Sequence, residues 1–262
     1  MLFSAANYVS INQQVDKIIL LPLGAIEQHG PHLSVSTDCD IITEIALHAE
    51  SQLNADILLC PTLPFGSSHH HLGFGGTMSI SALIYTQMMV ELVESLLHNG
   101  FRRIILLNGH GGNITPVKQA LTILSNKYDA TLRPNIVLAT YWELPGKIFS
   151  GNPPMESPAL SHACEYETSL MLYLFSEKVF PNEIKRAKRP DSNGFIPWED
   201  DEAYRGVTMV KQTEFISDNG SSGEPQLASA YKGKYLFEHT VESLVQFISS
   251  FKTWPILYAL SK

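Results

Sequence analysis

Side chains that can bind a metal ion are concentrated in one short stretch near the start of the chain. The stretch follows a run of apolar residues at 18–21 and precedes a helical pattern that begins near residue 41. It contains Glu27, His29, His32, Asp38 and Asp40. No Lys or Arg occurs between residues 20 and 56 to neutralise the carboxylates. Carboxylate oxygens and imidazole nitrogens in such a group suit a divalent cation.

The elements around this stretch should hold its side chains at one edge of a sheet. Residues 18–21 are all apolar and are bounded by a proline, which predicts a short buried strand. Glu27 and His29 are two residues apart, so they leave the same face if the chain is still extended there. Asp38 precedes the periodic apolar residues of a helix, for which Thr37 or Asp38 is the expected N-cap. Ligands in open α/β sheets lie at this carboxyl end of the strands.

Each of these residues has a plainer interpretation when it is taken alone. An aspartate just before a helix is more often a cap than a ligand, and a single histidine in a loop usually has no chemical role. The grouping of several such residues at one predicted strand end is what favours metal binding over these alternatives.

A second candidate follows a predicted strand at 103–107. That strand leads into Asn-Gly-His-Gly-Gly-Asn at 108–113, a glycine-rich turn before a helical pattern. The turn matches neither GxxxxGK[ST] nor GxGxxG, so the pattern argues against a phosphate-binding loop. A metal-binding role for His110, at the end of a buried strand, is the better interpretation.

A third group lies at residues 161–169, which read Ser-His-Ala-Cys-Glu-Tyr-Glu-Thr-Ser. Ser161 is the expected N-cap of a helix. Glu165 and Glu167 point about 200° apart on a regular helix, so at most one of them faces a given site, and periodicity does not decide which. Cys164 lacks the local signatures of a cysteine nucleophile.

Three consecutive histidines, His69 to His71, lie in a loop that has four glycines between residues 64 and 77. A histidine tract is a metal-binding pattern, but neighbouring side chains diverge. At most one or two of the three can therefore serve a single site, and the rest are expected to be surface residues.

The composition predicts a soluble, globular protein. The 262 residues are 44% hydrophobic and 17% charged, which suits one domain spanning 1–262. A net charge of −8, with one short basic run at 185–189, argues against nucleic-acid binding. Three cysteines without a CxxC pair favour a reducing compartment. With no signal-peptide pattern and no apolar run near ~20 residues, we expect no membrane contact and a cytoplasmic location.

Strands and helices alternate along the predicted chain. The expected strands are 18–21, 57–60, 103–107 and 135–140, with a possible further strand at 206–210. The expected helices follow residue 41 and span 79–99, 115–128 and 234–252. This alternation predicts a single α/β domain with a mostly parallel sheet covered by helices on both faces.

The three groups together offer five or more oxygen and nitrogen ligands from separated elements. This number exceeds the four ligands that one tetrahedral zinc ion needs. Two divalent ions roughly 3.5–4 Å apart, bridged by a carboxylate, would use all of them. Such a pair lowers the pKa of a shared water and polarises a carbonyl.

Four collinear segments of the sequence are typical of one enzyme family. They read GAIEQHGPHL followed by TD, then NGHGGN, HACEYETS and GEPQLASAYKG. In this order, and spread over residues 20–233, they resemble the creatininase (creatinine amidohydrolase) family. The resemblance implies a sandwich-like α/β fold with a parallel sheet, a two-metal amidohydrolase site with Zn²⁺ and/or Mn²⁺, and commonly a hexamer.

The resemblance also implies which residues hold the two metals. Glu27 and His110 would hold one of them. His29 and Glu167 would hold the other, and Asp38 would bridge the pair. This assignment settles the choice between the two glutamates of the third group, which periodicity alone left open.

His162 is implied to lie near the substrate as a polarising or proton-transferring group, with Ser68 and Gly111 as further substrate contacts. Two positions depart from true creatininases. Those enzymes carry a glutamate two residues after the metal-binding histidine, where this chain has Gly112. They also carry a tryptophan four residues before the later histidine, where this chain has Pro158.

A third departure lies in the loop at 68–71, which reads Ser-His-His-His where much of the family reads Ser-x-Glu-His. The NGHGGN segment also occurs in relatives that hydrolyse formamides of pterin or flavin precursors, and in peptidases that trim a redox-cofactor precursor. We therefore expect metal-dependent hydrolysis of a C–N bond in a cyclic amide, a formamide or another small amide, by a homo-oligomer.

Two other classes of function compete with this hypothesis. A metal-dependent sensor or binding protein would keep the site without turnover, and the missing glutamate at 112 favours it. A structural metal protein would use the ions only to hold the fold together, and its sites would be closed, without an open coordination position. Turnover of an amide by the metal-loaded protein distinguishes the hydrolase from the sensor, and an open coordination position argues against the structural protein.

Overall fold

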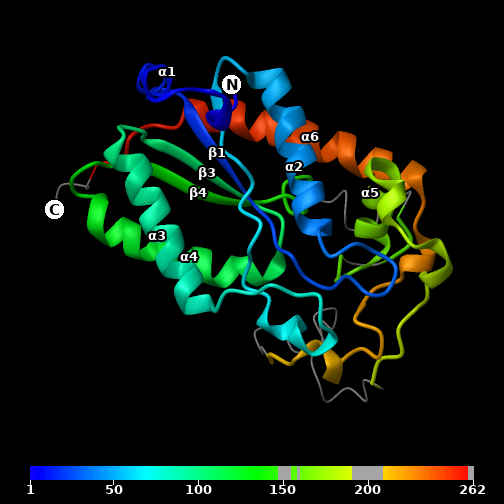
Figure 1. The fold of residues 1–262 in the computed structure, drawn as a ribbon. Helices are drawn as coiled ribbons and strands as arrows, with labels where there is room; N and C mark the ends of the chain where they lie inside the picture. The colour runs from blue at the N-terminus through cyan, green and yellow to red at the C-terminus, as the bar shows by residue number, and fades with distance from the viewer. Residues whose placement is uncertain (147–154, 158–159, 191–208, 259–262) are drawn as a thin grey trace.

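Strands and helices alternate along the chain and form a parallel sheet with helices on both faces (Figure 1). The structure is a computed structural model that describes residues 1–146, 155–157, 160–190 and 209–258. Within these residues, four strands run parallel in the order β2-β1-β3-β4. Their bounds are Ile18–Leu23 for β1, Ile57–Leu59 for β2, Arg103–Asn108 for β3 and Asn135–Thr140 for β4.

Six α-helices accompany the sheet in the described part of the chain. They are α1 (Tyr8–Asn12), α2 (Thr37–Leu53), α3 (Ala82–His98), α4 (Ile114–Tyr128), α5 (Glu165–Leu174) and α6 (Ala230–Lys252). Short 3-10 helices include η2 (His69–Phe74), η3 (Gly111–Asn113) and η8 (Thr213–Phe215). Helices α2, α5 and α6 cover one face of the sheet, and α3 and α4 cover the other (Figure 1).

Successive residues of β1 face opposite helical layers because side chains alternate along a strand. Ile18 and Leu20 pack in the core under α2, α5 and α6, whereas Ile19 and Leu21 pack in the core under α3 and α4. All six residues of β1 are buried, as expected for a parallel strand covered on both sides. Each fully buried Ile or Leu side chain contributes roughly 1.5–3 kcal/mol to stability. Packing on both faces therefore fixes the position of β1, the strand that precedes the first group of possible metal ligands.

The α/β architecture predicted from the sequence is confirmed, but α5 starts later than predicted. Its N-cap is Cys164, and Ser161 lies before the helix. The reason is local backbone geometry, because Ala163 has φ 51° and turns the chain in the left-handed region just before the helix. The later start places His162 in a loop and Glu165 and Glu167 in the first helical turn.

Helix α6 begins earlier than residue 234, where the apolar pattern starts. Ser229 caps it, and its side chain accepts a hydrogen bond from the Lys232 N–H. The possible strand at 206–210 falls largely outside the described residues. Within the described ranges, no helix has both the length and the apolar character needed to cross a bilayer.

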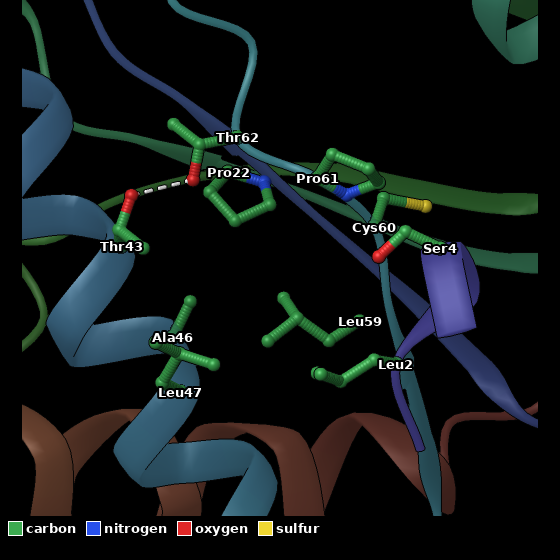
Figure 2. A pocket seen from close by; sticks show the side chains of 10 residues that line it. All are labelled: Leu2, Ser4, Pro22, Thr43, Ala46, Leu47, Leu59, Cys60, Pro61 and Thr62. Atoms are coloured by element: carbon green, nitrogen blue, oxygen red, sulfur yellow. Dashed lines mark hydrogen bonds between the residues drawn. The ribbon is translucent and has the colours of Figure 1, made fainter.

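A cavity of about 130 Å³ lies between α2, the end of β2 and the N-terminal residues (Figure 2). Its lining is largely aliphatic, and a hydrogen bond of 2.6 Å joins the hydroxyls of Thr43 and Thr62 beside it. Cys60 is its one titratable side chain, and burial raises the pKa of this thiol to about 12. The cavity therefore offers none of the acid or imidazole groups of the sequence motifs.

Candidate metal centre

The carboxylate and imidazole side chains of the three sequence groups, which could bind a metal ion, converge at the carboxyl edge of the sheet. They form two groups whose candidate ligand atoms lie within 4.8 Å of one another. One group is Glu27, Asp38 and His110, and the other is His29, His162 and Glu167. The loops after β1 and β3, the loop before α5, and the first turns of α2 and α5 supply these residues. This is the edge at which open α/β sheets bind ligands.

Asp38 lies between the two groups. Its Oδ1 is 3.1 Å from His29 Nε2, and its Oδ2 is 3.1 Å from His110 Nδ1. Asp38 is only 3% exposed. The interpretation of this residue as a helix cap is wrong, because Ser36 occupies the cap position and Asp38 lies inside the first turn. One carboxylate thus faces a histidine of each group, as a bridging ligand would.

Glu167 faces the cluster and Glu165 does not. Glu167 Oε1 lies 4.0 Å from His29 Nε2, and its Oε2 accepts a hydrogen bond of 2.6 Å from the Ala163 N–H. Glu165 turns the other way, where Lys232 and two main-chain N–H groups contact its oxygens. The helix geometry explains this division, because residues two apart point to different sides.

Three histidines of the cluster are each anchored by a main-chain carbonyl. The pairs are His29 Nδ1 with Glu27 O at 3.2 Å, His110 Nε2 with Ser67 O at 3.3 Å, and His162 Nε2 with Gln28 O at 2.7 Å. A carbonyl oxygen only accepts, so the neutral ring carries its proton on that nitrogen. In the neutral form of each ring the second nitrogen is bare and faces the carboxylates. Metal-binding histidines are oriented in this way by their second nitrogen.

Three carboxylate oxygens of the cluster lack donors among the described residues. Both oxygens of Glu27 and Oδ2 of Asp38 are inaccessible to solvent, and no residue of the described ranges donates a well-aligned hydrogen bond to them. Glu27 is 1% exposed. An ionised carboxylate buried without donors is costly unless a cation or a charged partner compensates it. These oxygens, together with the bare imidazole nitrogens, fit hard or borderline divalent cations.

The titration behaviour of the cluster reflects the closeness of acids and imidazoles. Burial would raise the pKa of Glu27, but His110 and other imidazoles hold it well below its usual range. Burial would lower the pKa of His29, but Asp38 and the other carboxylates raise it to about 10. Burial raises the pKa of Glu167 to about 7, with His29 opposing and Asp38 adding to the shift. The acids and imidazoles of the cluster therefore interact strongly with one another.

The other predicted site residues border the same cluster. Ser68 is buried, and its hydroxyl lies 3.1 Å from His110 Nε2. His162 Nδ1 lies 3.6 Å from Glu27 Oε1. Gly111 opens η3 beside the metal-type histidine and is exposed. Pro158 lies outside the described residues, so its place relative to the cluster is left as a prediction.

His32 and Asp40 belong to the first sequence group but not to the cluster. His32 Nε2 lies 3.0 Å from the Thr168 hydroxyl, and burial lowers the pKa of this histidine to about 4. Asp40 accepts hydrogen bonds from Ser36 and Lys178. Both side chains therefore help to hold the surrounding elements together.

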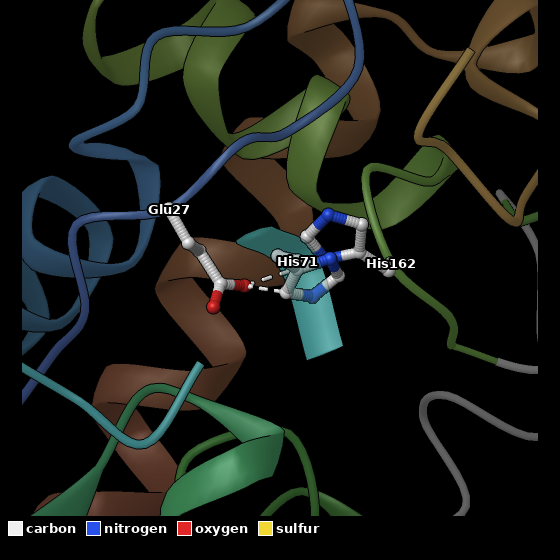
Figure 3. A group of neighbouring side chains, drawn as sticks. All are labelled: Glu27, His71 and His162. Carbon is white, nitrogen blue, oxygen red and sulfur yellow. Dashed lines mark ion pairs between the residues drawn. The ribbon is translucent and has the colours of Figure 1, made fainter. Parts of the chain in front are cut away.

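The histidine tract at 69–71 contributes one buried member. His71 is 3% exposed, and its Nε2 lies 3.4 Å from Glu27 Oε1. Figure 3 shows Glu27, His71 and His162 side by side, and their candidate ligand atoms form a third close group. Sequence reasoning limited the tract to one or two site residues but did not select this one. The 3-10 helix η2 decides the choice, and no sequence pattern marked it.

A family model described as creatinine amidohydrolase matches residues 5–248. The chain belongs to the creatininase family. A mycofactocin precursor peptide peptidase of Mycobacterium tuberculosis is 30% identical over 90% of this chain and 86% of its own length. A creatinine amidohydrolase of Pseudomonas putida is 29% identical over 89% of both chains. A creatininase crystal structure has the same fold, with a TM-score of 0.80 at 21% identity over 97% of this chain and 98% of its own.

In a member of the creatininase family, the converging carboxylates and imidazoles support a metal-dependent amidohydrolase. Such an enzyme hydrolyses a carbon–nitrogen bond, and the catalogued relatives include hydrolases of this kind. The resemblance seen in the sequence motifs is therefore confirmed for the family and for the general reaction.

Gly112, where true creatininases carry a glutamate, has no space for a side chain in this structure. A Cβ there would lie 2.1 Å from Ser67 O and 2.5 Å from His110 Nε2. We expect Gly112→Ala to lower the free energy of unfolding by about 1–3 kcal/mol, the usual cost of overpacking. Urea unfolding of the purified variants measures this.

The neighbouring glycine supplies a matched control for that substitution. A Cβ on Gly111 would meet no heavy atom within 4 Å. Gly111→Ala should therefore change the unfolding free energy by less than about 0.5 kcal/mol. Equal stability of the two variants would show that the space around Gly112 relaxes freely, contrary to this account.

Proposed function

We propose that the protein hydrolyses a small amide with two divalent cations. Glu27 and His110 would hold one cation, His29 and Glu167 the other, and Asp38 both. The observation that carries the proposal is the position of Asp38, a buried carboxylate with one oxygen 3.1 Å from a histidine of each group. The donor-free oxygens of Glu27 support it further.

The proposed cations are Zn²⁺ and/or Mn²⁺. Solved creatininases of this fold include one described as Zn-Zn type and one described as Mn. Mixed carboxylate and imidazole ligands suit both ions. When bound, a pair of such cations acts as a Lewis acid on a carbonyl and lowers the pKa of a water.

The chain's own residues have separable roles in this proposal. Because His162 Nε2 donates to the Gln28 carbonyl, its bare Nδ1 is the nitrogen that can take up a proton and hand it to the leaving amine. Ser68 and Gly111 border the cluster and would orient the substrate. The absence of a carboxylate at position 112 leaves His162 as the proposed proton carrier.

The proposed substrate is a cyclic amide, a formamide or another small amide, including the amide of a short peptide. The catalogued relatives carry the names of a peptidase, a creatinine amidohydrolase and a deformylase, and these names are consistent with amide hydrolysis. Loss of space at Gly112, where creatininases carry a glutamate, argues against creatinine as the preferred member of this class.

A metal titration combined with a substrate panel tests the proposal. The purified protein is stripped with a chelator, reloaded with Zn²⁺ or Mn²⁺, and assayed on creatinine, formamides and short peptides. We expect uptake of two equivalents and turnover of at least one amide. Failure to take up metal would refute the site. Metal uptake without turnover on a broad panel would favour a binding or sensor protein.

Replacing His162 by glutamine should separate proton transfer from metal binding. The neutral amide cannot accept a proton at neutral pH, so we expect kcat to fall about 10²–10⁴-fold, the usual contribution of a general acid–base group. The metal content should stay at the wild-type value, because the proposed ligands are untouched. Elemental analysis and steady-state kinetics on the same preparation measure both. An unchanged kcat would remove His162 from the mechanism.

We further propose that residues 1–262 form a single catalytic domain and that the chain works in the cytoplasm as a homo-oligomer, with a hexamer as the proposed assembly. The continuous match to the family model over residues 5–248 supports the single domain. The three cysteines, which include no CxxC pair, support the location. Light scattering of the metal-loaded protein would measure the oligomeric state.

A further inference from the structure

The main chain fixes the orientation of the Gln28 side-chain amide. The Gly30 N–H donates to Gln28 Oε1 at 2.9 Å, and Gln28 Nε2 donates to the Gly220 carbonyl at 2.9 Å. Exchanging the amide oxygen and nitrogen would set donor against donor and acceptor against acceptor. Gln28 is 6% exposed, and a Cβ on Gly220 would lie 2.1 Å from Gln28 Oε1. One N–H of the amide is left for another partner.

The remaining amide N–H reaches His71. Gln28 Nε2 lies 2.8 Å from His71 Nδ1, and the Thr213 hydroxyl lies 2.8 Å from the same nitrogen. His162 Nε2 is 3.1 Å from the amide, but it already donates to the Gln28 carbonyl and cannot accept. An amide N–H only donates, so His71 Nδ1 accepts and carries no proton. The proton of the neutral ring is then on Nε2, which faces Glu27 Oε1 at 3.4 Å.

The proton of the His71 ring therefore lies on the nitrogen that faces the carboxylates, unlike the protons of the three carbonyl-anchored histidines. His29, His110 and His162 each present a bare nitrogen to the carboxylates, because the other nitrogen donates to a carbonyl. His71 presents an N–H instead. A metal ion binds a bare imidazole nitrogen and not an N–H, so distance alone does not make His71 a ligand.

We propose that Gln28 is a positioning residue that keeps His71 out of metal coordination and presents its Nε2–H to Glu27. The inference rests on the proposed two-metal function and deepens it. Although the ligand atoms of Glu27, His71 and His162 lie close together, this third group holds no cation of its own (Figure 3). Glu27 Oε1 faces the His71 N–H at 3.4 Å, and Glu27 Oε2 lies 3.3 Å from His110 Nε2, the nitrogen that also faces the Ser67 carbonyl.

Nitrogen-15 NMR of histidine-labelled, zinc-loaded protein reads the proton position directly. In the wild type we expect the His71 ring, assigned by its loss in His71→Ala, to carry its proton on Nε2. Gln28→Met removes the amide, and the Thr213 hydroxyl alone can either donate or accept, so both tautomers should appear. Thr213→Val keeps the amide and should keep the wild-type tautomer.

Metal binding supplies the second readout. In Gln28→Met a bare His71 Nε2 becomes available as an additional ligand, so the zinc affinity should change relative to the wild type, while Gln87→Met on the exposed side of α3 should leave it unchanged. His71→Ala should still take up two equivalents at saturating zinc, whereas His110→Ala should lose one. A lost equivalent in His71→Ala, a bare wild-type Nε2, or an unchanged tautomer in Gln28→Met would overturn the proposal.

These outcomes are separate from failure of the proposed function. If the wild type binds no zinc, the two-metal function is refuted. The tautomer of His71 is still measurable in that protein, and it alone then decides whether Gln28 positions the ring.

Discussion

Replacing Asp38 by asparagine is expected to abolish binding of both cations and to lower kcat/KM by at least about 10³-fold. A single carboxylate faces a histidine of each group at 3.1 Å, so its charge is shared by the two proposed ions. Losing the metal removes several kcal/mol of transition-state stabilisation, and about 4 kcal/mol corresponds to that factor. Elemental analysis and kinetics on the same preparation measure the two effects.

Asp40→Asn is the matched control for this substitution. Asp40 lies two residues further along α2 and pairs with Lys178 at 2.8 Å outside the cluster. The same chemical change there should leave metal content and activity close to the wild type. Full metal content in the Asp38 variant would contradict the assignment of a shared ligand. Loss of metal in both variants would point to a general effect on the helix.

Replacing Lys232 by methionine is expected to destabilise the fold by about 3–5 kcal/mol. Lys232 and Glu165 form an ion pair in which the side chains are 9% and 0% exposed. Glu156, the other carboxylate on Lys232, is 63% exposed and contributes little. Removing the lysine leaves the Glu165 charge buried without its partner. For a chain of this size we expect a fall in Tm on the order of 10 °C, measured by calorimetry.

Two further variants make this prediction specific. Lys234→Met, on the same helix but with a side chain that is 57% exposed, should change stability by less than about 0.5 kcal/mol. Adding Glu165→Gln to Lys232→Met should recover part of the loss, because the unpaired charge is then gone. A double variant less stable than the single one would argue that the pair is not the cause.

The α/β architecture and the meeting of the site residues at one edge of the sheet could both be predicted from the sequence. Apolar runs such as 18–21 and 103–107 form parallel strands, and the carboxyl ends of parallel strands lie at one edge. Side chains placed just after those ends, such as Glu27 and His110, therefore approach one another without any knowledge of the loops.

The choices that sequence reasoning left open depend on contacts between distant segments. Glu165 is held by Lys232, which lies far along the chain, and its neighbour Glu167 is thereby left to face the metal-type histidines. The selection of His71 from its tract depends on η2 and on contacts with Gln28 and Thr213. Helical periodicity and ligand counting carry no information on such contacts.

The anchoring of three histidines by main-chain carbonyls has an evolutionary consequence. A peptide oxygen is supplied whatever amino acid occupies the position, so mutation at 67 changes the side chain and leaves the proton acceptor of His110 in place. Lineages can therefore alter the walls around the centre, as at position 112, while the ligand nitrogens keep their readiness for a cation. Such a scaffold permits a change of substrate while the metal centre stays the same.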